Sequence, residues 1–254
     1  MIESNVSKQS YELLFEAINV GSKTHLKETL EYLLPSKKIA DSNIGKKQIQ
    51  YFESVNLIQQ PYSNIVEIGC GDGELTKILS EEFPESNIIG VDRNKDLIEK
   101  NKRKFNQKNI QFICEDIQNE SKKYFGDLVV GLHTCGDLTD ESIDIVIRSN
   151  SDIIITPCCY GKLTKNRYEY SKNNENIISK VKKLEGLQKQ GRETYTDLIR
   201  ESYRLLINID RGLKLKTYGF DAEIVRLIPQ KQIIKNKKQR LSTLNQTIIG
   251  TKQW

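Results

Sequence analysis

The sequence predicts an α/β fold with a doubly wound, mostly parallel sheet and a helical N-terminal extension. From residue 64 onward, short apolar runs alternate with amphipathic stretches. Continuous apolar runs are typical of parallel strands buried on both faces, and the stretches between them supply the crossover helices that such strands need. A glycine-rich turn follows the first run, and two strand-like segments close the chain.

Three segments before residue 60 place apolar residues at three- and four-residue intervals, which indicates amphipathic helices. They are YELLFEAINV (11–20), HLKETLEYLL (25–34), which Pro35 ends, and KKQIQYFESVNLI (46–58). These helices precede the first apolar run, so they form an extension in front of the alternating part of the chain.

The alternating part contains five expected strands, which are NIVEIG (64–69), NIIGVD (87–92), IQFICED (110–116), DLVVGLH (127–133) and DIIITPC (152–158). Three helices are expected between them: ELTKILSEEF (74–83), KDLIEKNKRKF (95–105) and DESIDIVIRS (140–149). A long amphipathic helix (196–209) follows, with Gly219 as a stop signal. The strand-like segments 221–229 and 244–252 close the chain, which gives seven strands in all.

Composition and charge exclude several classes of protein. With 37% hydrophobic residues the chain can form a sizeable core, and no apolar run is long enough to span a bilayer. The N-terminus lacks a signal-peptide pattern, and five cysteines do not make a disulfide framework, so we expect a reduced, cytoplasmic protein. The net charge of +5 is local: segments 160–195 and 230–240 together carry +10.

The most informative segment is a glycine-rich turn that leads from the first strand into a helix. It reads Glu67-Ile68-Gly69-Cys70-Gly71-Asp72-Gly73. A dinucleotide-binding turn would need a further glycine at position 74, where Glu74 stands. An acidic residue two positions before the first glycine favours a ligand with a positive end over a pyrophosphate.

This segment resembles the first signature of the class I S-adenosylmethionine-dependent methyltransferases, which have a Rossmann-like, seven-stranded, doubly wound sheet. The resemblance implies S-adenosyl-L-methionine as cofactor, with Glu67 near its methionine amino group and Gly69, Gly71 and Gly73 shaping the methionine cradle. Asp92, at the end of the second strand, corresponds to the ribose-binding acid. Asp116, at the end of the third, corresponds to the acid that contacts the adenine amino group.

The tips of the fourth and fifth strands are similar to a narrower group. They read His133-Thr134-Cys135-Gly136-Asp137-Leu138-Thr139-Asp140 and Thr156-Pro157-Cys158-Cys159-Tyr160. These motifs resemble the tRNA ribose-methyltransferases that modify the acceptor stem. They resemble more closely the methyltransferase-like relatives that include the glutathione-S-transferase-C-terminal-domain-containing protein. The match covers roughly residues 45–163. The zinc-finger segments of the tRNA enzymes are absent, and strand five ends in Cys-Cys-Tyr instead of Cys-Cys-His-His.

Four residues at these tips are catalytic candidates. For direct transfer to a hydroxyl, His133 is a general base and Tyr160 stacks on a base or donates a hydrogen bond. Covalent catalysis, the alternative, would use a Cys135 or Cys158 thiolate, as cytosine-carbon methyltransferases use cysteines at the same two tips. The alternative to a catalytic role is that His133 is a neutral structural imidazole and that Cys135 and Cys158 are inert buried thiols. We expect no metal, because adjacent Cys158 and Cys159 would point apart on a strand.

We therefore expect a helical extension over residues 1–44 that covers the cofactor or the substrate, and a methyltransferase domain over 45–254 with a basic insertion at about 160–195. The charge pattern favours RNA, with tRNA first, as the substrate. The residues expected to bind it are Lys162, Arg167, Lys235, Lys237, Lys238 and Arg240. A small-molecule or protein methyltransferase and a non-catalytic binding module are the alternatives. The sequence leaves the oligomeric state and the acceptor atom open.

Overall fold

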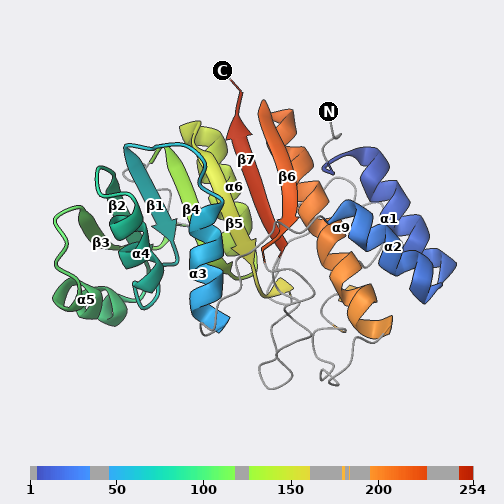
Figure 1. Ribbon diagram of the computed structural model, residues 1–254, viewed down its shortest axis with the longest axis horizontal. Helices are drawn as coiled ribbons and strands as arrows, with labels where there is room; N and C mark the ends of the chain where they lie inside the picture. Colours follow the sequence, from blue (N-terminus) through green and yellow to red (C-terminus); the bar gives the residue numbers. More distant parts are fainter. Residues whose placement is uncertain are drawn as a thin grey trace.

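The computed structural model describes residues 5–34, 46–117, 126–160, 179–180, 183, 195–227 and 246–253. These residues form a mixed sheet with helices on both of its faces (Figure 1). No helix within these ranges is long and apolar enough to cross a membrane.

The sheet contains seven strands in the order β3-β2-β1-β4-β5-β7-β6. Their bounds are β1 Asn64–Ile68, β2 Asn87–Asp92, β3 Ile110–Cys114, β4 Leu128–Thr134, β5 Asp152–Pro157, β6 Phe220–Arg226 and β7 Gln246–Lys252. The first five strands pair in parallel, and β7 inserts antiparallel between β5 and β6. The chain reverses direction across the sheet between β1 and β4, so the carboxyl ends of these strands form the crevice where open α/β sheets bind ligands.

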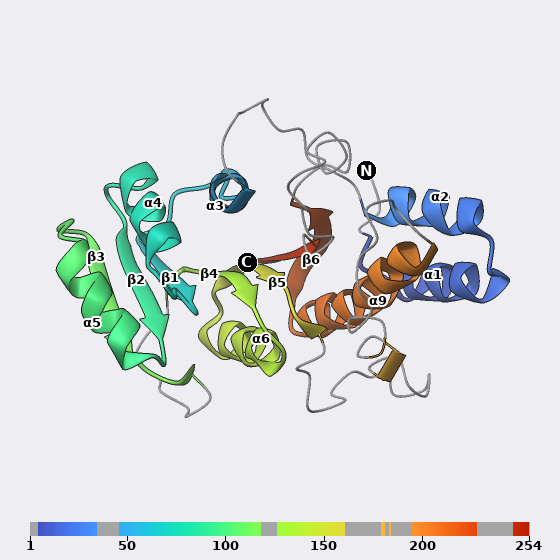
Figure 2. The same ribbon diagram turned by 90° about the horizontal axis from the view of Figure 1, so that it is seen from below.

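Helices cover both faces of the sheet. Figure 2 shows α3 (Lys46–Asn56) and α4 (Glu74–Glu82) on one face, and α6 (Asp137–Ser149) and α9 (Tyr195–Thr217) on the other. Helix α5 (Lys95–Lys104) packs against β2 and β3. This layering explains why strands such as β5 are buried along their whole length and read as continuous apolar runs.

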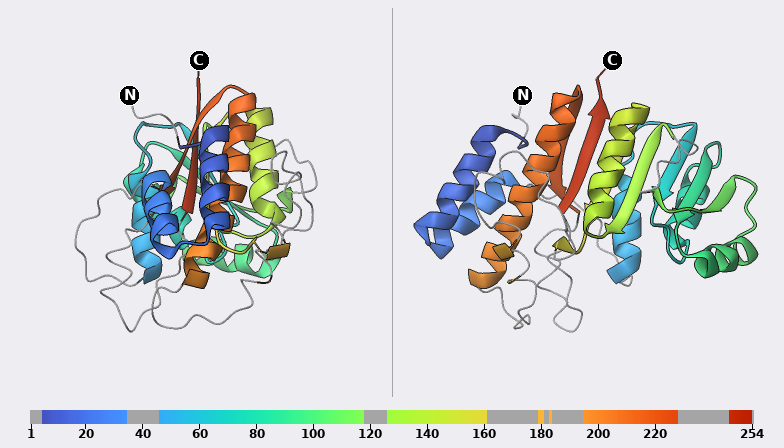
Figure 3. Two further views of the ribbon diagram at one scale, coloured as in Figure 1. Left: turned by 90° about the vertical axis from the view of Figure 1, so that its right-hand side faces the viewer. Right: turned by 180° about the vertical axis from the view of Figure 1, so that it is seen from behind.

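The N-terminal helices pack at the other end of the sheet from the ligand crevice. Helices α1 (Lys8–Val20) and α2 (Lys23–Leu33) lie against α9, beyond strand β6 (Figures 1 and 3). The side-chain amide of Asn5 pairs with the backbone of Ile224 on β6, at 2.5 Å to its carbonyl and 3.0 Å from its N–H. The described part of the extension thus covers a sheet edge, and the expectation that the extension covers the cofactor or the substrate stays a prediction.

Helix α9 is anchored by buried ion pairs. The guanidinium of Arg211 contacts both carboxylate oxygens of Asp140 on α6, each at 3.0 Å, and Arg226 on β6 contacts Glu201 at 2.7 Å. Asp140 lies inside the first turn of α6, whose N-cap residue is Gly136.

Candidate active site

A cavity of about 440 Å³ opens at the carboxyl ends of strands β1 to β4. Its lining residues come from the tips of four strands and from the start of α6. They are Ile68, Gly69, Val91, Asp92, Arg93, Glu115, Asp116, Ile117, Cys135, Asp137 and Leu138. Four of these side chains are carboxylates and one is a guanidinium, so the lining favours a cationic ligand over an anionic one.

The glycine turn borders the cavity through Gly69. Gly69, Gly71 and Gly73 all adopt positive φ, at 73°, 51° and 76°. Gly69 and Leu138 both line the cavity, and a Cβ added at Gly69 would lie 3.4 Å from the side chain of Leu138. Any side chain at position 69 would therefore narrow the binding space. A Cβ at Gly73 would lie 2.8 Å from Phe105. The turn therefore needs glycine for its backbone conformation and for close approach.

Three predicted cofactor residues line this cavity, and two of them, Asp92 and Asp116, contribute carboxylates. The carboxylate of Asp92 accepts hydrogen bonds from the backbone N–H groups of Gly71 and Asn94, at 3.0 and 2.9 Å. It thereby ties the tip of β2 to the glycine turn. Asp116 lies two residues beyond β3, and its carboxylate is 3.9 Å from the guanidinium of Arg93.

Glu67 is close to the cavity but does not line it. Its side chain is buried in β1 and accepts a hydrogen bond from the hydroxyl of Thr76 on α4. Burial raises the pKa of Glu67 to about 8, the hydrogen bond from Thr76 opposes this, and the nearby carboxylates of Asp72 and Asp92 add to it. Glu67 thus links β1 to the first turn of α4, the two elements that flank the glycine turn.

The raised pKa of Glu67 predicts a pH-dependent stability. Between its ordinary pKa of 4.5 and about 8, the folded chain binds more protons at this site than the unfolded chain does, so stability falls as pH rises through this window. Glu67→Gln should remove this pH-dependent loss of folding free energy, which is on the order of 1–3 kcal/mol. Urea unfolding at about pH 5 and about pH 8 measures it. Glu85→Gln, at an exposed site, is the control, and equal pH dependence in the wild type and Glu67→Gln would contradict the assignment.

His133 occupies a strained position at the tip of β4. It has a left-handed φ of 62°, beside a bulge in the pairing of β4 with β5. Its Nε2 lies 3.1 Å from the Oε1 of Gln50, which is buried in α3. Left-handed backbone at a residue other than glycine is characteristic of functional sites, because the surrounding structure must hold it in place. His133 lies two residues before Cys135, which lines the cavity.

Tyr160 does not fit the role predicted for it. The side chain is 2% exposed, and its hydroxyl accepts a hydrogen bond from the Nδ2 of Asn208 at 2.7 Å. The guanidinium groups of Arg204 and Arg211 lie over its ring, at 5.6 and 5.5 Å from the centroid. A ring enclosed in this way by α9 cannot stack on a nucleotide base, so Tyr160 is a packing residue here.

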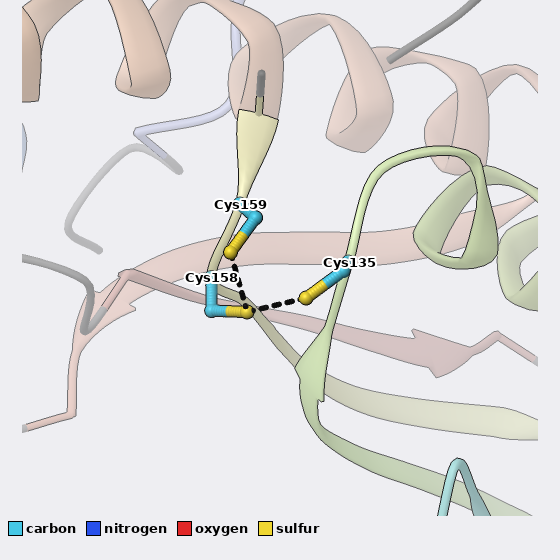
Figure 4. A group of neighbouring side chains, drawn as sticks. All are labelled: Cys135, Cys158 and Cys159. Carbon is cyan, nitrogen blue, oxygen red and sulfur yellow. Dashed lines mark hydrogen bonds between the residues drawn. The ribbon is translucent and has the colours of Figure 1, made fainter. Parts of the chain in front are cut away.

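The two candidate cysteines, Cys135 and Cys158, lie close to a third cysteine, Cys159. The Sγ atoms of Cys135 and Cys158 are 2.7 Å apart, and those of Cys158 and Cys159 are 3.4 Å apart (Figure 4). The expectation that Cys158 and Cys159 point apart was wrong, because β5 ends at Pro157 and the strand alternation ends with it. The pKa of the Cys158 thiol is raised by the hydrogen bond with Cys135 and by burial.

The six predicted RNA-binding residues lie outside the described residues. They are Lys162, Arg167, Lys235, Lys237, Lys238 and Arg240. Most of the basic segments 160–195 and 230–240 lies there as well, so their position relative to the cavity stays a prediction.

Sequence reasoning missed two residues: Gln50, which contacts His133, and Cys159, whose sulfur lies beside that of Cys158. Gln50 lies 83 positions before His133, and the only local signal was the polar character of the buried face of α3, where Glu53 and Ser54 are also buried. Cys159 was set aside on the assumption that the strand continues through it.

The comparisons with known proteins agree with this geometry. Residues 46–166 match a family model described as a methyltransferase domain. The methyltransferase domain of a bacterial Hen1 structure superposes with a TM-score of 0.50 and 14% identity, covering 82% of this chain and all of that one. The strand order and this superposition show the class I methyltransferase fold.

Two curated relatives match parts of the chain. The malonyl-[acyl-carrier protein] O-methyltransferase of Acetivibrio thermocellus is 30% identical over 111 residues, which cover 42% of this chain and 39% of that protein. The glutathione S-transferase C-terminal domain-containing protein of Bos taurus is 22% identical over 218 residues, which cover 78% and 33%. The chain therefore spans about a third to two-fifths of the length of these relatives.

Proposed function

We propose that this chain transfers a methyl group from S-adenosyl-L-methionine to a nucleophilic acceptor. Residues 46–166 match a methyltransferase domain, and the sheet has the class I S-adenosylmethionine-dependent methyltransferase fold. The observation that carries the proposal is the cavity at the carboxyl ends of β1 to β4. It is lined by Gly69 of the positive-φ glycine turn and by a carboxylate at the tips of both β2 and β3.

The cavity fits this cofactor in shape and in charge. A Cβ at Gly69 would narrow it, and the lining carboxylates complement a ligand that carries a sulfonium and an ammonium group. Asp92 would hold the ribose hydroxyls and Asp116 the adenine amino group. Gly69 and Gly71 would let the methionine part approach the backbone. When bound, S-adenosyl-L-methionine supplies an electrophilic methyl group on its sulfur.

The acceptor side is assigned to His133 and Gln50. The Nε2 of Gln50 is buried and has no hydrogen-bond partner within the described ranges, and a buried amide N–H costs about 1–3 kcal/mol when unpaired. A polar group of the acceptor would satisfy this amide. The Oε1 of Gln50 accepts the N–H at Nε2 of His133 and so orients the ring, which leaves Nδ1 as the nitrogen that takes the proton lost by the acceptor.

Direct transfer predicts that His133→Ala slows methylation by about 10²–10⁴-fold while cofactor affinity stays the same, because His133 does not line the cavity. Methylation rates and calorimetric titration of S-adenosylhomocysteine measure the two effects. His25→Ala is the matched control, since His25 is the other histidine and is exposed on α2. Wild-type rates for His133→Ala, or a trapped covalent adduct between a cysteine and the acceptor, would contradict the assignment of His133.

RNA, with tRNA first, is our first acceptor class. Its support is the charge of +10 on segments 160–195 and 230–240, where Tyr168 and Tyr170 stand among lysines and arginines. In this proposal Lys162, Arg167 and the cluster of Lys235, Lys237, Lys238 and Arg240 contact phosphates. Methylation of total RNA with radiolabelled S-adenosylmethionine, followed by nucleoside analysis, tests it.

The cluster of basic residues at 235–240 supports a quantitative prediction. Replacing Lys235, Lys237, Lys238 and Arg240 with Gln should weaken RNA binding about equally across sequences. The slope of log affinity against log salt should become shallower by about 0.7–0.9 for each phosphate that the variant no longer binds. Binding of wild type and variant at several salt concentrations measures this, and cofactor affinity is the control. An unchanged slope would contradict RNA binding by these residues.

A carboxylate on a small molecule or a carrier protein is the second candidate acceptor. It is favoured by the relative from Acetivibrio thermocellus, whose name gives malonyl-[acyl-carrier protein] as its substrate. Methyl incorporation into such an acceptor, with none into RNA, would select this candidate. Cofactor binding without transfer to either acceptor class would indicate a non-catalytic binding module.

A further inference from the structure

The three cysteines at the tips of β4 and β5 form a compact sulfur cluster. The Sγ atoms of Cys135, Cys158 and Cys159 all lie within 4.8 Å of one another. Figure 4 shows Cys135 on the segment after β4, and Cys158 and Cys159 on the segment after β5, with their sulfurs turned toward a common point. Within the described ranges, this is the one group of His, Cys, Asp and Glu side chains with the spacing of metal ligands.

The backbone holds this cluster from both sides. Strands β4 and β5 pair up to Thr134 and Pro157, and the N–H of Gly136 donates to the carbonyl of Cys159 at 2.9 Å. The Sγ atoms of Cys135 and Cys158 lie 3.3 and 3.5 Å from the carbonyl oxygen of His133, which accepts from a thiol only while that thiol is protonated. The sulfurs converge because two paired strand ends hold the three residues. When the thiols lose their protons, the contacts with this carbonyl are exchanged for bonds to the ion.

The ligand set specifies the class of ion. Three thiols without a carboxylate select a soft metal ion over Mg²⁺ or Ca²⁺. We propose that Cys135, Cys158 and Cys159 bind Zn²⁺ as three thiolates, with the fourth coordination position left to water or to another ligand. This proposal is independent of methyl transfer.

Binding of the ion requires only local changes. Each thiol gives its proton to solvent as its sulfur forms a bond to Zn²⁺, and no oxidation or reduction takes place. Zinc–sulfur bonds of about 2.3 Å place tetrahedral thiolates about 3.8 Å apart, so Cys135 and Cys158 must separate from their present 2.7 Å. Cys158 is buried, whereas Cys135 and Cys159 are partly exposed, so the ion has access from their side. Because Cys135 also lines the 440 Å³ cavity, the ion would lie at its edge.

The test is metal binding by the full chain, reduced and freed of metal with a chelator. Zn²⁺ is titrated in competition with a chromophoric chelator, and Co²⁺ is used as a spectroscopic substitute. We expect one equivalent of Zn²⁺ per chain and a sulfur-to-cobalt charge-transfer band. Cys135→Ser, Cys158→Ser and Cys159→Ser should each weaken Zn²⁺ binding by at least about tenfold, since even outer-shell changes cost about 10–100-fold. Cys114→Ser, at an exposed cysteine outside the cluster, should bind like the wild type.

A second measurement on the wild type keeps the test valid if a variant does not fold. Zn²⁺ should protect Cys135, Cys158 and Cys159 from alkylation, as read by mass spectrometry, and should leave Cys114 reactive. Absence of Zn²⁺ binding by the reduced wild type would overturn the proposal, and so would equal binding by all the serine variants. A Cys135–Cys158 disulfide formed in air, with no Zn²⁺ binding after reduction, would identify a redox pair and would also overturn it.

Discussion

Replacing Arg211 with Met should lower the free energy of unfolding by about 3–5 kcal/mol, because it removes the guanidinium that contacts both oxygens of the buried carboxylate of Asp140. Arg211 is 1% exposed, contacts Asp140 through two nitrogens and donates to the Oδ1 of Asn208 at 3.1 Å. This network joins α9 to the start of α6, so its loss should also destabilise the tip of β4, which leads into α6. Urea unfolding followed by circular dichroism measures it.

Two controls separate the buried ion pair from a general loss of charge. Lys102→Met removes an exposed ion pair with Glu99 and should cost less than about 1 kcal/mol. The double variant Arg211→Met/Asp140→Asn should regain part of the stability, since it also removes the buried negative charge that the guanidinium of Arg211 balanced. A cost for Arg211→Met as small as that for Lys102→Met would refute the role of the network.

Asp92→Ala should weaken S-adenosylhomocysteine binding by about 1.5–3 kcal/mol, which is roughly 10–150-fold. The carboxylate is expected to hold the ribose hydroxyls, and it also accepts the N–H groups of Gly71 and Asn94 that fix the glycine turn. Calorimetric titration of the folded variant measures the loss. Glu99→Ala, on the exposed side of α5, is the control. Wild-type affinity in Asp92→Ala would refute the assignment of the cavity.

Much of the fold could be predicted because buried parallel strands and amphipathic helices leave local patterns. Strand β2 has the predicted bounds Asn87–Asp92, and α5 begins at the predicted Lys95. The closing strands β6 and β7 overlap the predicted segments 221–229 and 244–252. The class I fold followed from the glycine turn together with Asp92 and Asp116, three signals that belong to consecutive units of the sheet.

The parts of the site that escaped prediction depend on contacts between distant residues. Tyr160 is enclosed by Asn208, 48 positions later, and His133 meets Gln50, 83 positions earlier. No local pattern encodes either pairing. The orientation of Cys158 and Cys159 depended on where β5 ends, and strand ends are the least certain feature of a sequence pattern. The extension packs on α9 because its apolar faces complete the core there, which the sequence alone could not locate.

The most direct test of the central claim is the ligand preference of the cavity. Its lining contributes the carboxylates of Asp92, Glu115, Asp116 and Asp137 against the single guanidinium of Arg93. Calorimetric titrations of S-adenosylmethionine and of ATP into the wild-type chain compare two adenosine ligands of opposite charge. We predict that S-adenosylmethionine binds at one site per chain and that ATP binds at least about a hundredfold more weakly, because the carboxylates repel its triphosphate. ATP binding as tight as that of S-adenosylmethionine, or no S-adenosylmethionine binding at all, would contradict the proposed function.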